Sequence, residues 1–157
     1  MQKNIFITAL IFIALLSAQL YIVPFVSIGY IAPNLLIILL VYITLKEGQI
    51  YGTFTGFIFG FIFDFVSGGV IGSGMFAYTI AGFTAGYFFD ENNLREDISF
   101  VKLLGIIFFV SLVNNFFYSI LGTNEVIDMG ILFFDQSLFS AVYTSLLSIL
   151  LIVFFRK

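Results

Sequence analysis

The sequence predicts an all-α polytopic membrane protein in which six transmembrane helices form a single domain over residues 1–157. First, 61% of the residues are hydrophobic and only 10% are charged, whereas soluble domains are about 45–50% apolar and about 25% charged. Second, the apolar runs are long and continuous. They therefore indicate helices rather than the alternating strands of an outer-membrane barrel. Third, a six-span layout places every Lys and Arg on the same side of the membrane.

Six apolar segments carry this prediction, and we expect spans at about Ile5–Val26, Ala32–Leu45, Ile50–Val66, Val70–Phe89, Phe100–Leu121 and Ile131–Phe155. The first apolar run is too long for a signal-peptide core of about 7–15 residues. We therefore interpret it as a retained signal anchor that closes near Pro24. The second span is short for a bilayer that needs about 20 residues. Pro33 suits its first turn, where the missing N–H is not needed.

Polar connections separate the remaining spans. Lys46–Gln49 is a tight turn, and Ser67–Gly69 ends the third span. The most charged stretch, Asp90–Ser99, follows the fourth span and is interpreted as a solvated loop. A polar connection over Gly122–Gly130 precedes the last span, which ends at Arg156 and Lys157.

The positive charges support an even number of spans. All six cationic residues share one side of this layout, namely Lys3, Lys46, Arg95, Lys102, Arg156 and Lys157. Positive charge marks the cytoplasmic side, so we expect both termini in the cytoplasm. With five spans, the last two of these residues would move to the outside.

A stripe of small residues with one acid runs through the third span. Gly52, Gly56, Gly60 and Asp64 follow one another at four-residue steps, and Gly68 and Gly72 continue them. A four-residue step drifts only about 40° around a helix, so the stripe stays on one face. It is expected either to pack within the protein or to form a groove for a partner's helix. Gly82 and Gly86 form a second small-residue pair, expected to pack between helices.

Asp64 has two interpretations. An acid within a span predicts an ion or proton site, or it is a helix-end carboxylate that accepts hydrogen bonds from nearby backbone. It lies about 21 Å into the span, near the outer interface. This depth favours a structural or partner-binding role.

Polar side chains also line the last two spans. They are Asn114, Asn115 and Tyr118 in one, and Gln136, Ser137, Ser140, Thr144, Ser145 and Ser148 in the other. Because polar groups in lipid need partners, these residues either bond to one another or line a small-ligand cavity. Glu125, Asp128 and Asp135 are expected at the outer interface, either solvated or facing a basic partner.

Several activities are excluded by what the sequence lacks. It contains no Cys and no His, so thiol chemistry and the usual zinc, copper and haem ligands are absent. It shows no hydrolase triad, phosphate-binding loop or dinucleotide fingerprint, so we expect no catalysis and no cofactor. Its net charge of −3 and the lack of a basic tract give no indication of nucleic-acid binding.

One ordered set of residues resembles the core signature of the MreD family of bacterial rod shape-determining inner-membrane proteins. It begins with Pro33-Asn34-Leu35-Leu36 and Tyr42. The set continues with Gly48, Gly52, Gly56-Phe57, Gly60, Asp64, Ser67-Gly68, Gly72, Ala77-Tyr78 and Gly82. The likeness extends over about Pro33–Gly86, and the absence of Trp departs from many relatives.

The resemblance implies a non-enzymatic scaffold of cell-shape determination in the bacterial inner membrane. Such proteins bind MreC and connect MreB filaments to the RodA glycosyltransferase and a class B penicillin-binding transpeptidase. Pro33 and Asn34 would then serve helix packing. The sequence leaves a homo-oligomer open.

The family is also similar in architecture to the substrate-binding S-components of ECF vitamin transporters, which supplies a second interpretation. In that case the chain would be a vitamin-like small-molecule binding subunit. As a scaffold, it is expected to receive MreC on the face formed by Gly52, Gly56, Gly60 and Asp64. The turn with Ser67, Gly68 and Gly72 would complete that surface.

Overall fold

The structure is a computed structural model that describes residues 2–29, 31–90, 99–122 and 137–155. Within these ranges the named elements of secondary structure are helices. The helices are α1 (Gln2–Tyr21), α2 (Val23–Val26), α3 (Leu35–Glu47), α4 (Gln49–Ser67), α5 (Ser73–Gly86), α6 (Phe100–Gly122) and α8 (Phe139–Phe155).

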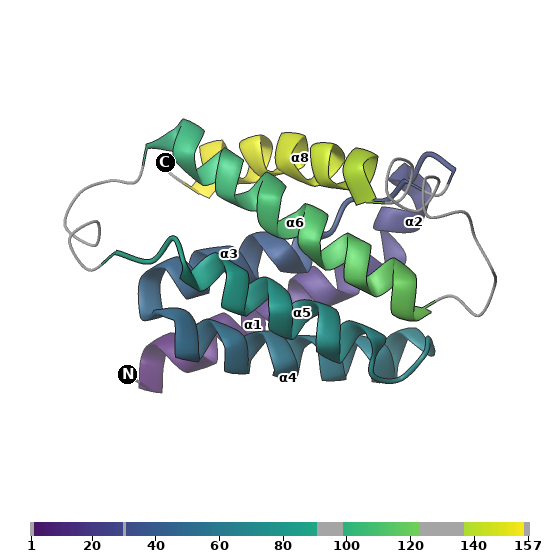
Figure 1. The fold of residues 1–157 in the computed structure, drawn as a ribbon, viewed down its shortest axis with the longest axis horizontal. Helices are drawn as coiled ribbons and strands as arrows, with labels where there is room; N and C mark the ends of the chain where they lie inside the picture. The colour runs from purple at the N-terminus through teal and green to yellow at the C-terminus, as the bar shows by residue number, and fades with distance from the viewer. Residues whose placement is uncertain (1, 30, 91–98, 123–136, 156–157) are drawn as a thin grey trace.

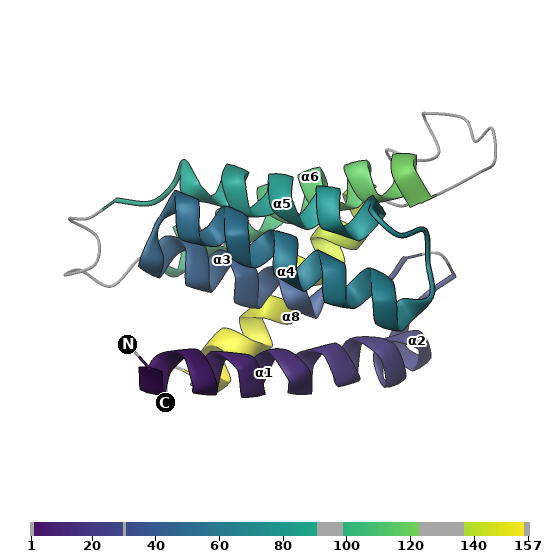
Figure 2. The ribbon, with the colours of Figure 1, turned by 90° about the horizontal axis from the view of Figure 1, so that it is seen from below.

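The long helices run back and forth along one axis. In Figure 1, α1, α4 and α6 run in one direction, and α3, α5 and α8 return in the other. Both chain ends therefore lie at the end of the bundle where α3 turns into α4, and the α4–α5 turn lies at the opposite end. Figure 2, turned by 90°, shows the same separation and places α1 along one side of the bundle.

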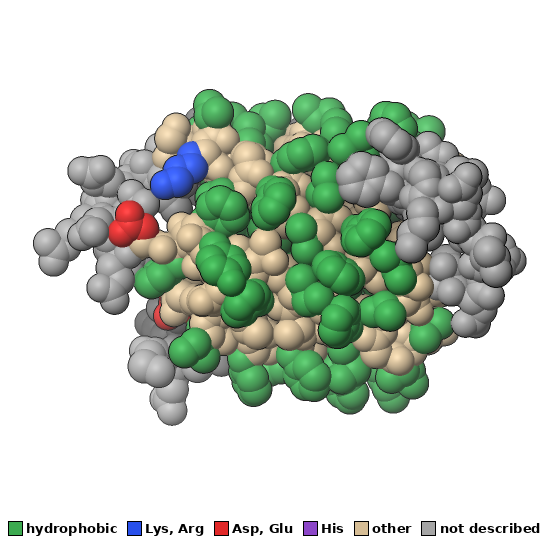
Figure 3. All heavy atoms as spheres, in the orientation of Figure 1, with side chains coloured by type: hydrophobic (Ala, Val, Ile, Leu, Met, Phe, Trp, Pro, Cys, Tyr) green, Lys and Arg blue, Asp and Glu red, His purple; other side chains and the backbone are tan. Residues whose placement is uncertain are grey.

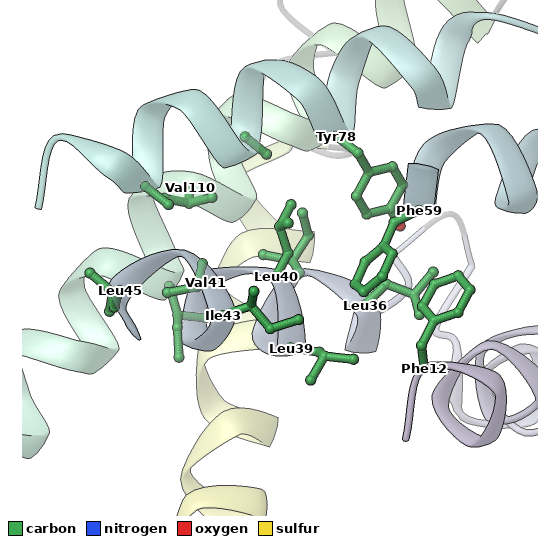
Figure 4. Packing of buried hydrophobic residues seen from close by; sticks show 14 of the residues in the cluster. Phe12, Leu36, Leu39, Leu40, Val41, Ile43, Leu45, Phe59, Tyr78 and Val110 are labelled. Carbon is green, nitrogen blue, oxygen red and sulfur yellow. The ribbon is translucent and has the colours of Figure 1, made fainter. Parts of the chain in front are cut away.

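The apolar core is centred on α3. Its side chains Leu36, Ile37, Leu40 and Val41 are fully buried, so this short helix is hydrophobic all round, as expected of an interior helix. Figure 4 shows Leu40 and Val41 of α3 near Val110 of α6, and Leu36 near Phe59 of α4 and Phe12 of α1. On the side of α1, Phe12 stacks on Phe59 of α4 with ring centroids 4.0 Å apart.

The first expected span is broken, which corrects the prediction of one helix to Val26. Helix α1 ends at Tyr21, and Pro24 lies in the first turn of the separate short helix α2. Proline tolerates that position because no N–H is needed there. The bend therefore falls just before Pro24 rather than at the end of the span.

Pro33 does not lie in the first turn of a helix, so that expectation is wrong. Helix α3 begins at Leu35, and its N-cap is Asn34, whose backbone is extended with φ −111° and ψ 97°. The Asn34 side chain accepts a hydrogen bond from Ile37 N, the usual role of an N-cap asparagine. Since an Asn cap satisfies a free amide, the helix begins after it rather than at Pro33.

Two of the described helices, α4 and α6, are long and apolar enough to cross a membrane; α1 and α8 contribute shorter apolar segments, Phe6–Tyr21 and Phe139–Ile149. The expected third and fifth spans match α4 and α6 within a residue or two at each end. The second and fourth are shorter than a bilayer, because α3 and α5 have 13 and 14 residues, or about 20 Å each. Six complete spans thus stay a prediction. The start of the last expected span, 131–136, and the acids Glu125, Asp128 and Asp135 lie outside the described residues.

The surface has the distribution expected of a membrane protein. In Figure 3, hydrophobic side chains cover the visible face between the two ends, while the charged side chains drawn in colour gather at one end. That end is where α3 turns into α4. Large apolar side chains exposed along the bundle, such as Phe54 and Phe65, are what a lipid environment requires.

Candidate functional site

The glycine stripe of α4 lies directly against α5. A Cβ atom added at Gly56 would lie closer than 3.0 Å to the backbone carbonyl of Tyr78, and one added at Gly60 would meet the carbonyl of Gly74 as closely. At Gly52 the added atom would meet the side chain of Thr44 in α3. Small residues permit this close approach of two helices in a membrane. The stripe is therefore filled by this chain's own helices, and a partner helix could reach it only by displacing α5.

Helix α5 presents matching small residues to α4. A Cβ at Gly82 would lie within 3.0 Å of the backbone oxygen of Gly52, and one at Gly86 would meet Gln49. The Gln49 amide also donates to Phe83 O at 3.0 Å. Gly82 and Gly86 thus lie at the α4–α5 contact, the helix-packing position assigned to them from the sequence.

Asp64 closes the same contact at the far end of α4. Its side chain is 1% exposed. Oδ2 accepts from Gly72 N at 2.8 Å and from Met75 N at 3.1 Å, and Gly74 N donates to both carboxylate oxygens at 2.9 and 3.1 Å. A Cβ on Gly74 would collide with this carboxylate.

The carboxylate of Asp64 acts as an N-cap supplied by another helix. Helix α5 starts at Ser73 with Gly72 at the N-cap, and Gly72 has no side chain to satisfy the free amides of the first turn. A negative charge beside those amides is also stabilised by the helix dipole. This geometry matches the helix-end interpretation of Asp64.

The turn between α4 and α5 depends on two glycines with positive φ. Gly68 has φ 68° and ends α4, and Gly72 has φ 105° and begins α5. An added Cβ would meet nothing within 4 Å at either position, so backbone conformation rather than space favours glycine there. Ser67, Val70 and Ile71 are exposed on this turn.

A second group of polar contacts surrounds the extended segment before α3. Ala32 N donates to Ser140 Oγ at 3.2 Å, and Asn34 N donates to Thr144 Oγ1 at 2.9 Å. From α1, Gln19 accepts from Leu35 N at 2.8 Å and donates to Pro33 O at 3.0 Å. Irregular backbone at membrane depth is tolerated where protein satisfies it, and these side chains do so.

Asn34 connects three helices at this place. Its Oδ1 accepts from Tyr78 OH at 2.9 Å as well as from Ile37 N, and its Nδ2 donates to Asn114 Oδ1 at 3.3 Å. Because Asn34 accepts the hydrogen bond from Ile37 N through Oδ1, its Nδ2 faces Asn114. Nδ2 is a donor, so the Asn114 atom that it contacts is the acceptor Oδ1. The orientation of both amides follows.

Asn114 is left with an unused donor. The residue is 1% exposed, and its buried Nδ2 has no hydrogen-bond partner among the residues that the structure describes. A buried donor without an acceptor costs about 1–3 kcal/mol.

A cavity of about 320 Å³ lies beside this cluster. Residues of α1, α4, α5, α6, α8 and the segment before α3 line it: Gln19, Ala32, Pro33, Asn34, Phe63, Tyr78, Asn114, Asn115, Tyr118, Ser119 and Ser140. The polar residues expected in the last two spans therefore include some that form hydrogen bonds within the protein and some that also line a cavity. Asn114 and Ser140 bond to other residues and line the cavity, while Thr144, Ser145 and Ser148 form hydrogen bonds away from its wall. Gln136 lies outside the described residues.

Sequence reasoning missed Gln19 and Tyr78 as members of this cluster. Gln19 is a polar residue within an apolar segment, and the rule that polar groups in lipid need partners would have singled it out. Tyr78 is fully buried with its hydroxyl on Asn34. A lone tyrosine in an apolar helix gave no comparable signal, because tyrosines are also frequent at membrane interfaces.

The family model described as rod shape-determining protein MreD matches residues 1–157. No curated protein and no solved structure matches the chain.

Proposed function

Because this chain belongs to the MreD family, we propose that it acts as a non-enzymatic membrane scaffold and regulator in the determination of rod shape. It binds MreC. Through MreC it links the MreB cytoskeleton to RodA and to the class B penicillin-binding transpeptidase that extend peptidoglycan. The family match over the whole chain is the observation that carries this proposal.

The proposed MreC-binding region is the outer part of the α4–α5 hairpin. Phe61, Phe65 and Ile71 are 49%, 76% and 72% exposed there, and we call these three side chains the hairpin surface. Gly52, Gly56, Gly60 and Asp64 support this surface from beneath, by holding α4 against α5. Ser67, Gly68 and Gly72 shape the turn beside it.

The proposed orientation follows the positive charges. The protein is a multi-pass inner-membrane protein with both termini in the cytoplasm. The α4–α5 turn is at the opposite end of the bundle from the chain ends (Figure 1), so the hairpin surface reaches the outer side. An extracytoplasmic domain of MreC would emerge beside it.

Co-purification of MreC tests the proposal. The chain is expressed with MreC, and the Phe61→Ala/Phe65→Ala/Ile71→Ala variant is compared with wild type after membrane solubilisation. A matched control carries Phe83→Ala/Tyr87→Ala/Val101→Ala, since these side chains are 45%, 71% and 75% exposed away from the turn. We expect MreC recovery to fall at least tenfold with the hairpin variant and to be unchanged with the control. Equal recovery with a monodisperse hairpin variant would place the MreC contact elsewhere.

The cavity favours a second candidate, a small-molecule binding subunit of a membrane transporter. Its volume of about 320 Å³ is at the lower limit of small-molecule sites, about 300–1,000 Å³. A transporter subunit needs an energy-coupling partner, so it would recover an ATPase instead of MreC from membranes. Recovery of MreC without an ATPase favours the scaffold.

A further inference from the structure

We propose that the connection between α1 and α3, residues 22–29 and 31–34, is a re-entrant segment that lies within the bilayer and contacts lipid acyl chains. The contact is made by the large exposed side chains of Ile22, Phe25 and Ile28, which we call the α2 surface. This interaction goes beyond the scaffold function and does not depend on MreC, since the α2 surface and the hairpin surface share no residue.

The composition of the connection suits lipid rather than water. The sequence contains no charged residue between Lys3 and Lys46, so the connection and most of the helices on either side of it are uncharged. At the other end of the bundle, the turn between α3 and α4 includes the exposed residues Lys46 and Glu47. Charged groups are costly in the hydrocarbon region of a bilayer, and the connection between α1 and α3 avoids that cost.

The lengths of α1 and α3 place the connection below the membrane surface. Both helices have one terminus at the same end of the bundle, α1 at Gln2 and α3 at Glu47 (Figure 1). From that end, the 20 residues of α1 reach about 30 Å, the thickness of the hydrocarbon core, whereas the 13 residues of α3 reach about 20 Å. The chain therefore returns about 10 Å into the hydrocarbon region before α3 begins.

The backbone of the connection has hydrogen bonds that such a depth requires. Irregular backbone within a bilayer is stable only where its polar groups have partners. Ile28 and Ile31 exchange backbone hydrogen bonds of 3.0 and 3.1 Å, and Ser27 N donates to Val23 O at 2.9 Å. The two prolines of the connection have no N–H that needs an acceptor.

Helix α8 holds the connection at both of its ends. Near the start, Tyr143 OH donates to Val26 O at 2.9 Å. Near the end, Ser140 Oγ accepts from Ala32 N at 3.2 Å. The polar groups of the connection thus bond to the protein, and its large apolar side chains are left on the outside.

The α2 surface continues the apolar exterior of α1. Phe25 is 91% exposed, and Ile22 and Ile28 are 61% and 71% exposed. Figure 2 shows α2 directly after the far end of α1, where the exposed side chains Ile13 and Tyr21 lead towards it. Tyrosine is typical of the membrane interface, so Tyr21 marks the level from which the chain re-enters the lipid. Continuity with this exterior identifies acyl chains as the occupant of the α2 surface.

Site-directed spin labelling of the full chain in vesicles of phosphatidylethanolamine and phosphatidylglycerol tests the proposal. The chain contains no Cys, so Phe25→Cys and Ile28→Cys each introduce a single site for a nitroxide. Relaxation of the nitroxide is measured with oxygen, which concentrates among acyl chains, and with a water-soluble nickel complex. Ile13→Cys, on the exposed side of α1, is the lipid reference, and Glu47→Cys is the water reference.

We expect the ratio of oxygen to nickel accessibility at Phe25→Cys and Ile28→Cys to exceed that at Glu47→Cys at least about fivefold and to approach that at Ile13→Cys. Ratios equal to that at Glu47→Cys would place the connection in water and overturn the proposal. Labels shielded from both oxygen and nickel would show that protein, such as a second copy of the chain, covers the α2 surface, which overturns it as well.

Reconstitution together with MreC separates lipid from a protein partner. We expect the oxygen accessibility of both labels to be unchanged by MreC, because the α2 surface faces lipid in either case. A loss of oxygen accessibility on addition of MreC would assign the α2 surface to a protein contact and overturn the proposal. The ratios measured without MreC hold whether or not the scaffold function is correct.

Discussion

The α4–α5 contact and the Asn34 cluster both contain buried polar groups, yet they are built in opposite ways. The Asn34 cluster is the hydrogen-bonded group of Gln19, Asn34, Tyr78, Asn114, Ser140 and Thr144. In the contact, glycines bring backbone against backbone and every carboxylate oxygen of Asp64 is used. In the cluster, the amide donor of Asn114 has no hydrogen-bond partner within the described part of the chain, and a cavity lies beside the cluster. The contact therefore stabilises the fold, and the cluster has room to bind.

This difference predicts that removing a polar side chain lowers the stability of the fold most where several donors share it as their acceptor. Asp64→Leu leaves the buried amide of Gly74 and the part-buried amides of Gly72 and Met75 without their acceptor. At about 1–3 kcal/mol for each lost acceptor, it is expected to destabilise the protein by about 3 kcal/mol or more. Asp64→Asn keeps one acceptor oxygen and is expected to cost about half as much.

Thermal unfolding in detergent measures both Asp64 variants. Hydrogen exchange at residues 72–75 should accelerate in Asp64→Leu before it does so elsewhere in α5. An Asp64→Leu protein with the wild-type midpoint would show that the carboxylate is not the cap of α5.

The close packing of the same contact is tested by adding one methyl group. Gly56→Ala places a Cβ against the Tyr78 carbonyl, which cannot rotate away, and we expect a loss of about 1–3 kcal/mol. Gly105→Ala in α6 is the control, because nothing lies within 4 Å of its added Cβ. It should be neutral or stabilising by about 0.5–1 kcal/mol. If the unfolding midpoints of these two variants shift alike, α4 and α5 are not in close contact.

In the Asn34 cluster, the largest loss of stability is expected when Asn34 itself is substituted. Asn34→Leu removes the cap of α3 and the acceptor for Tyr78 OH, and we expect a loss of about 2 kcal/mol. Combined with Asn114→Leu, the total should be smaller than the sum of the single effects, because the two amides bond to each other. Additive midpoint shifts would contradict that bond.

Tyr78→Phe is expected to have the smallest effect. It removes one hydroxyl donor to Asn34 while the ring stays packed, at a cost of about 1 kcal/mol. Tyr87→Phe is the control, since Tyr87 is 71% exposed and its loss should not be measurable. A Tyr78→Phe protein as stable as the control would show that the hydroxyl bond contributes nothing.

Much of the fold could be predicted because membrane helices leave long apolar runs. Helices α4 and α6 match their predicted spans closely, since continuous hydrophobic sequence bounded by Gly or charge leaves few alternatives. The start of α3 was misplaced because Pro33 and Asn34 both signal a helix start, and only tertiary contacts with Ser140 and Thr144 decide between them. Pro24 was the one residue in the sequence that indicated a break between α1 and α2.

The site was predictable in part. The four-residue steps from Gly52 to Asp64 predicted a single face, and that face packs against α5 at Gly56 and Gly60 and against Thr44 of α3 at Gly52. Spacing within one helix could not say which helix fills the face. The cavity needed α1, α4, α5, α6, α8 and the segment before α3 to be placed together, and its members Gln19 and Tyr78 are distant in sequence from Asn114.

Recovery of MreC with two variants in parallel tests the central claim most directly. The hairpin-surface variant Phe61→Ala/Phe65→Ala/Ile71→Ala and the cavity-filling variant Asn115→Trp are each purified with co-expressed MreC. We predict that MreC is lost at least tenfold from the first and retained by the second, because scaffold binding uses the rigid hairpin and not the cavity. Retention by the hairpin variant together with loss from Asn115→Trp would contradict the account.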